Sequence, residues 1–254
     1  MKLKNAVKIY PKIYKGCVYT DVGNKLRRTL QMKEELINRK RKLEKRLSEY
    51  GLSDYKITSA LYLKYNQKDF ASSSEIAKRL IVLYAIFYGA TNIDKISKIK
   101  DWLININLWT EVSDVEKMFL EGEIDDEEKV EEFAWNIEKA YILAWTLNIV
   151  SDKPIPTDQI SDKQFDDFVS NVPDLGTDNL NDFINNQKLR DFDEIYDENL
   201  FNELVTTYFR DQMFNGEKNK TKLDPRATFE RHYTLNWVRR FSGITDWDET
   251  DTST

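Results

Sequence analysis

A run of nine consecutive apolar residues constrains the fold of this chain more than any other feature. The run extends from Leu80 to Tyr88 and follows Ser72 and Glu75, which have the S-x-x-E spacing of a capping box at a helix start. A helix that is apolar on every side has no face for water, so other elements must surround it. It is too short to cross a membrane. We therefore predict a central, enclosed helix that Gly89 closes in the left-handed conformation.

The composition favours an all-α fold. The chain has 254 residues with 41% hydrophobic content, and it contains only 8 Gly and 5 Pro, whereas small all-β folds need frequent turns rich in these residues. We predict a mainly α, irregular multi-helix bundle, with a short β-hairpin or an extended arm over residues 7–22. Residues 1–70 should form this arm and a basic helix, and residues 71–254 a helical core domain, joined in one continuous globular unit.

Apolar spacing and capping signals predict the other helices. A basic helix is expected over 24–50, where Gly51 ends it, and a long helix over 125–148. The long helix carries two apolar stripes, so we expect neighbours on both of its sides. The last helix opens with Asp224 and Pro225, an N-cap followed by proline at the first helical position. Further boundaries are predicted at Ser113, Gly122, Ser161 and Gly216, with separate helices around Leu180–Ile184, Leu189–Ile195 and Leu200–Phe209.

Charge is unevenly distributed along the chain. The net charge of -6 argues against general affinity for nucleic acid or anionic membranes, because both favour a basic surface. Lys and Arg nevertheless crowd the helix predicted over 24–50, while residues 152–203 and the tail after Gly243 are acidic. Either the basic helix lies on the acidic part of the molecule or in solvent, or it faces phosphate or RNA, which leaves a nucleic acid partner open.

The sequence shows neither a membrane span nor a secretory signal. No segment approaches the roughly 20 apolar residues that span a bilayer, and Met1 to Tyr19 lacks the apolar block of a signal peptide. Cys17 is the only cysteine, which excludes an internal disulfide. We expect a cytoplasmic protein that does not bind membranes.

Charged residues fall inside two helices that are expected to be enclosed. Glu138 interrupts an apolar stripe of the helix over 125–148, and Arg231 lies near the start of the last helix. A charge stranded in the interior costs several kcal/mol, so we hypothesise that these two side chains lie near one another. A structural ion network is the favoured interpretation, and a ligand pocket is the alternative. The full candidate polar cluster is Glu138, Glu230, Arg231, His232, Asp248 and Asp251.

No motif in the sequence assigns a reaction. His232 is the only histidine, and a histidine without a nearby Ser or Cys nucleophile is a weak catalytic signal. The chain has no His pair at i, i+4, no Cys cluster and no calcium loop. The carboxylates at 125–128 fit the first turn of a helix, where the dipole favours negative charge. We expect no metal and no cofactor.

Several segments carry a family resemblance. The runs Phe133 to Ile149, Glu230 to Trp237 and Trp247 to Thr252 resemble the bacterial family catalogued as domain of unknown function 4272. The segment Ser72 to Tyr88 is similar to that family's first apolar helix. Asn136 stands where the resemblance leads us to expect Arg. The resemblance implies a bacterial, cytoplasmic, helical protein and supplies no reaction.

These features favour a non-catalytic binding or regulatory protein that acts in the cytoplasm through protein–protein contacts. The basic helix or the acidic, aromatic tail would supply its binding surface. The alternative is an enzyme with a carboxylate-rich site drawn from Glu138, Glu230, His232 and Asp248. An enzyme needs a pocket around convergent polar groups, whereas an interaction protein presents an exposed apolar or charged patch.

Overall fold

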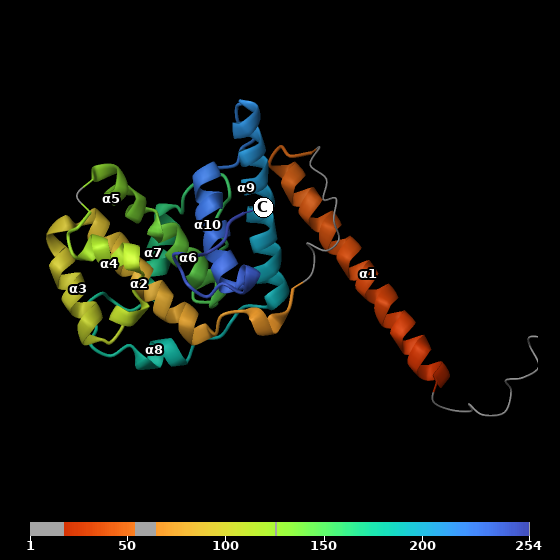
Figure 1. Ribbon diagram of the computed structural model, residues 1–254, viewed down its shortest axis with the longest axis horizontal. Helices are drawn as coiled ribbons and strands as arrows, with labels where there is room; N and C mark the ends of the chain where they lie inside the picture. The colour runs from red at the N-terminus through yellow and green to blue at the C-terminus, as the bar shows by residue number, and fades with distance from the viewer. Residues whose placement is uncertain (1–17, 54–64, 125, 254) are drawn as a thin grey trace, which may run out of the picture.

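The computed structural model describes residues 18–53, 65–124 and 126–253, with side chains from residue 34 onward. Every regular element within these ranges is a helix, and none of their residues forms a strand. The prediction of an all-α, multi-helix fold is confirmed (Figure 1). Of the hairpin or arm predicted over 7–22, residues 1–17 lie outside the described residues, and the rest begins the basic helix.

Most of the predicted helix boundaries are present in the structure. The capping boxes at Ser72, Ser113 and Ser161 are present, and Asp224 caps the last helix, where its Oδ1 accepts from the backbone N–H of Ala227 at 2.7 Å. The helices are α1 (Val18–Glu49), α2 (Ser73–Thr91), α3 (Ile96–Asn105), α4 (Asp114–Leu120), α5 (Glu127–Ala134), α6 (Asn136–Thr146), α7 (Asp162–Asn171), α8 (Asn181–Asn185), α9 (Phe192–Asn215) and α10 (Pro225–Val238). Turns of 3-10 helix occur at Gln67–Asp69, Ile93–Lys95, Trp109–Glu111 and Phe241–Gly243.

Helix α2 lies inside the globular body, as its apolar run predicts. Helix α6 packs along it, and α3, α5 and α8 contact other parts of its surface (Figure 1). Leu80, Ile81 and Leu83 are completely buried. Burying one side chain of this size contributes about 1.5–3 kcal/mol, so α2 is the centre of the hydrophobic core.

Gly89 does not close α2, contrary to the prediction. The helix continues to Thr91, and Gly89 lies inside it without a left-handed conformation. A Cβ atom at this position would be 3.3 Å from Cδ1 of Ile99 and 3.5 Å from Cε1 of Phe119. The missing side chain therefore lets α3 and α4 approach α2 closely.

The long helix predicted over 125–148 is also wrong, because it is broken at Trp135. The N–H of Trp135 bonds to the carbonyl three residues back, on Glu132, and the N–H of Glu138 bonds to that of Trp135. This tightened turn separates two packing environments. Phe133 of α5 stacks on Phe119 of α4 at 4.4 Å between ring centroids, while α6 packs against α2 and α10.

Helix α9 is one continuous helix where the sequence predicts separate helices. Polar residues interrupt its apolar pattern, but they are buried and paired with other helices. Glu198 accepts from Arg46 of α1 at 2.6 Å, and Asn199 donates to Asn236 of α10 at 2.9 Å. Burial disfavours the ionised form of Glu198, but the charges of Arg46 and Lys153 outweigh it and lower the pKa to about 2.

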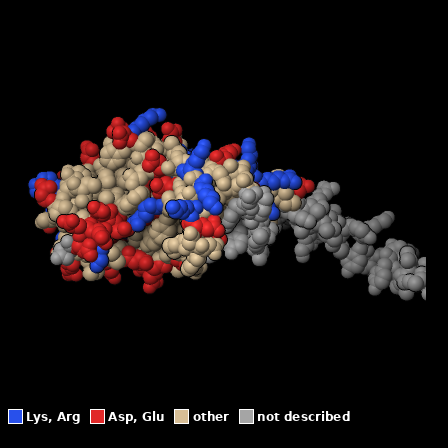
Figure 2. Space-filling view, turned by 90° about the horizontal axis from the view of Figure 1, so that it is seen from above, with Lys and Arg blue, Asp and Glu red and all other residues tan. Residues whose placement is uncertain are grey.

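Helix α1 extends outward from the globular body and packs on α9 near its C-terminal end (Figure 1). Leu43 and Leu47 are buried there in a small core with side chains of α9. Arg39 donates to Asp197 at 2.6 Å, so the C-terminal part of the basic helix lies on acidic residues of the same chain. Acidic side chains gather over much of the body, with Lys and Arg among them (Figure 2).

We predict that Leu47→Ala lowers the free energy of unfolding by about 2–5 kcal/mol, because Leu47 is fully buried between α1 and α9. Ile37→Ala, at an exposed position of the same helix, should change it by less than about 0.5 kcal/mol. Urea unfolding followed by tryptophan fluorescence measures both. We also propose that α1 and the core unfold as one unit, so two separate transitions would contradict this packing.

Candidate functional site

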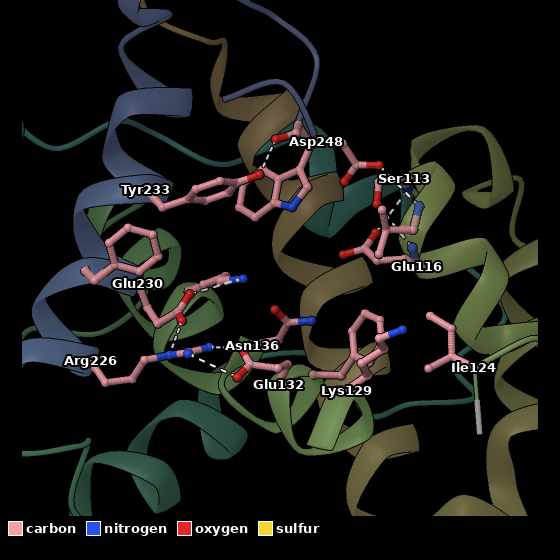
Figure 3. A pocket seen from close by; sticks show the side chains of 15 residues that line it. Ser113, Glu116, Ile124, Lys129, Glu132, Asn136, Arg226, Glu230, Tyr233 and Asp248 are labelled. Atoms are coloured by element: carbon pink, nitrogen blue, oxygen red, sulfur yellow. Dashed lines mark hydrogen bonds and ion pairs between the residues drawn. The ribbon is translucent and has the colours of Figure 1, made fainter. Parts of the chain in front are cut away.

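A pocket of about 390 Å³ opens beside α10. Figure 3 shows side chains converging on it from the start of α4, from α5, α6 and α10, and from the C-terminal tail. Two residues of the candidate polar cluster, Glu230 and Asp248, line it. Because the break at Trp135 separates α5 from α6, both helices contribute a wall: Phe133 from α5 and Asn136 from α6.

Glu230 is the buried anion of the pocket, with only 2% of its surface exposed. One carboxylate oxygen lies 3.2 Å from Nζ of Lys139 on α6, and the other lies 2.5 Å from Nε of Arg226, one turn earlier on α10. Arg226 also pairs with Glu132 of α5 (Figure 3). The four charges balance, so this part of the pocket is neutral.

Aromatic side chains form the opposite wall. Tyr233 and Trp247 meet edge to face at 5.1 Å between ring centroids, and the Tyr233 hydroxyl donates to the Trp247 carbonyl. Burial raises the pKa of Tyr233, which keeps this hydroxyl protonated. Nζ of Lys139 lies 5.2 Å from the centroid of the Tyr233 ring, within range of a cation–π contact. The tail is thereby held against α10.

A second ion pair supports this wall from behind. Arg79 of α2 and Glu116 of α4 are each 3% exposed. Nη1 of Arg79 donates to Oε2 of Glu116 at 2.9 Å. The guanidinium carbon of Arg79 lies 3.9 Å from the Trp247 ring centroid. Asp248 accepts from the backbone N–H of Val115 at 3.2 Å. The tail is therefore fixed to α4 and, through Arg79, to the central helix.

Glu138 and Arg231 lie in direct contact, but away from this pocket. Nε and Nη2 of Arg231 both donate to Oε2 of Glu138, at 3.1 and 2.6 Å, and each residue is 1% exposed. Arg231 also donates to the carbonyls of Ile155 and Asp158, and the N–H of Ile160 donates to Glu138. Burial raises the pKa of Glu138, and the charge of Arg231 opposes this. The pair holds the loop after α6 in place.

His232 and Asp251 occupy a third location. His232 is completely buried, its Nε2 lies 3.4 Å from Nδ2 of Asn236, and that amide also donates to the carbonyl of Asp251 at 2.8 Å. Burial, and then the charge of Arg210, lower the pKa of His232 to about 3. His232 is therefore neutral at pH 7 and contacts the inner side of the tail. The six cluster residues thus divide among three places.

The pocket contains residues that the sequence interpretation did not identify. Lys139, Arg226 and Asn136 line it, and Arg79 supports it from α2. Arg79 had a recognisable signal, since it is a charged residue within a helix expected to be enclosed. In the described ranges, no group of three His, Cys, Asp or Glu residues could hold a metal ion. None of the helices described there combines the length and apolar character needed to cross a membrane.

The family model of the domain of unknown function DUF4272 matches residues 39–250. The chain belongs to this family. The match begins earlier than the resemblance noted from the sequence, so the part of α1 that packs on α9 belongs to the DUF4272 domain. It also includes Trp247 and Asp248, which complete the pocket wall. No curated protein and no solved structure matches the chain.

We predict that Arg231→Met lowers the free energy of unfolding by about 3–5 kcal/mol, because it leaves Glu138 charged and buried without its partner. Glu138→Gln combined with Arg231→Met should recover part of this loss, since no charge then remains in the interior. Chemical unfolding of the two variants at pH 7 measures the difference. Equal stability of wild type and Arg231→Met would contradict the role of the pair.

His232 predicts a dependence of stability on pH. Its pKa falls from 6.5 to about 3 on folding, so between these values only the unfolded chain binds the proton. Stability should therefore fall as the pH drops below about 6.5, by up to about 1.4 kcal/mol per pH unit from this residue. The variant His232→Gln lacks this contribution to the free energy of unfolding. The carboxyl groups titrate in both proteins, so the comparison isolates the contribution of His232. Unfolding curves from pH 7 to pH 4 test this, and parallel profiles would contradict it.

Proposed function

We propose that this protein is a non-catalytic binding protein of the bacterial cytoplasm, and that it acts through contact with another protein whose chain enters the pocket beside α10. The observation that carries the proposal is the mutual pairing of the charges in the pocket. Glu230 lies between Lys139 and Arg226, and Arg226 also pairs with Glu132. Such an arrangement suits recognition, because each of these four side chains has a partner of opposite charge within the chain.

An enzymatic role has less support from the geometry. General acid–base catalysis needs a side chain that can exchange a proton with the substrate. Both carboxylate oxygens of Glu230 face cations, and His232 lies outside the pocket with a pKa of about 3. Glu138 also lies elsewhere, in its pair with Arg231. Of the four residues named for a carboxylate-rich active site, only Glu230 and Asp248 line the pocket.

The surroundings of the pocket suit a protein partner. Val115, at its edge, is 48% exposed. Ile124 lines both this pocket and a neighbouring apolar groove of about 510 Å³. Glu127 and Glu131 border that groove, so a partner segment with apolar side chains beside a basic residue would complement it. Exposed apolar surface next to a pocket is a feature of protein-binding sites.

Photo-crosslinking tests this proposal. A benzophenone amino acid at Val115 should crosslink one specific protein in the native host, because Val115 lies at the pocket edge. The same amino acid at Met213, which is 71% exposed and outside the pocket, should not. Equal adducts from the two positions, or none from Val115, would refute the proposal.

The crosslinked protein then allows a quantitative prediction. Lys139→Met removes a pocket charge but keeps the length of the side chain, so it should weaken binding of the purified partner by about tenfold or more. Met213→Ala serves as the matched control and should leave the dissociation constant unchanged. Titration calorimetry with the folded variants measures both, and unchanged affinity in Lys139→Met would locate the partner elsewhere.

A further inference from the structure

Asn136 presents a side-chain amide to the pocket without a partner among the described residues. It is the first residue of α6, only 3% of its surface is exposed, and it lines the pocket. Figure 3 shows its carboxamide facing the pocket space, and its side chain forms no hydrogen bond with any residue that the structure describes. A polar group that opens onto a pocket can exchange its contact with water for a hydrogen bond to a ligand. A group from outside the chain would supply this bond.

The chemistry of a carboxamide limits what that group can be. Asn offers N–H donors at Nδ2 and an acceptor at Oδ1, so a complementary ligand must present an acceptor and a donor side by side. An ionised carboxylate or a phosphodiester has no donor for Oδ1. Lys139, Arg226, Glu230 and Glu132 already pair with one another, so none of these four requires a charged group on the ligand.

The walls of the pocket specify the rest of the ligand. Phe133, Phe229, Tyr233 and Trp247 surround the space that Asn136 faces, so an apolar or aromatic side chain would fill it. In an extended peptide, the N–H and C=O of one residue point to the same side of the chain. One such residue therefore carries the donor, the acceptor and the apolar side chain together.

We propose that Asn136 binds the main chain of an extended segment of the partner protein. Its Nδ2 donates to the carbonyl of one peptide residue, its Oδ1 accepts from the N–H of the same residue, and the apolar side chain of that residue lies among the aromatic walls. This inference rests on the proposed function, since it names the part of the partner that enters the pocket. Asn136 then determines specificity for peptide chain over other apolar ligands.

The probe for this proposal is N-acetyl-L-phenylalanine methylamide, which holds one apolar residue between two peptide bonds. Its control is O-acetyl-L-phenyllactic acid methylamide, in which an ester oxygen replaces the N–H that Oδ1 would accept. Titrations of the full chain followed by ¹H–¹⁵N NMR should show millimolar binding of the amide and binding about fivefold weaker or more for the ester.

Two protein variants complete the test. Asn136→Leu keeps the size of the side chain but removes both hydrogen bonds, so it should reduce the affinity for the amide at least to that of wild type for the ester, which loses only one of them. Its thermal midpoint should stay close to that of wild type, because the Asn136 side chain forms no hydrogen bond within the described residues that the substitution could remove. Asn181→Leu, an exposed asparagine outside the pocket, should bind both probes as wild type does.

The outcomes separate this proposal from the proposed function. Equal affinity of wild type for the two probes, or equal binding by Asn136→Leu and wild type, would overturn main-chain recognition, while specific crosslinking from Val115 would leave the protein partner in place. Tighter, Asn136-dependent binding of adenine would also overturn it, in favour of a nucleobase. Absence of a crosslinked partner would refute the proposed function, whatever the probes show.

Discussion

The exclusion of water from α2 is the constraint on which the rest of the structure depends. A helix with apolar residues around its whole circumference is stable only when other helices cover it. This requirement brings α3, α5, α6 and α8 to its surface. It also requires an internal partner for Arg79, a charged residue of α2 that is buried. Its pairing with Glu116 and its contact with Trp247 connect the central helix to the wall of the pocket.

Buried charge pairs between different helices define how the outer helices fit together. Glu138 and Arg231 join α6 to α10, Glu198 and Arg46 join α9 to α1, and Glu203 and Arg239 join α9 to α10. If the helices shifted, each of these pairs would leave a charge unsatisfied. The pocket is built from the same kind of pair, since Glu230 of α10 contacts Lys139 of α6.

Local signals in the sequence were sufficient for the all-α fold and for most helix starts, but not for the extent of every helix or for the site. Capping residues such as Ser72 and Asp224 act on their own helix, so their effect is visible in a short segment. The contact of Glu138 with Arg231 also follows from a local argument, because each is a charge on an enclosed helix. The break at Trp135 and the close packing at Gly89 depend on side chains far away in the sequence, such as Phe119 and Ile99. The pocket combines residues of five segments, which no periodicity in one sequence predicts.

Helix α5 has far fewer buried residues than α6, the helix that follows it. Phe133 is its one buried residue, whereas nearly every residue of α6, directly after the break at Trp135, is buried. Regions with few buried contacts open locally at a lower free energy than the core. The wall formed by Glu132 and Phe133 can therefore move outward while α6 and α10 stay packed, so the pocket can admit a larger occupant than its closed volume suggests, without unfolding the bundle.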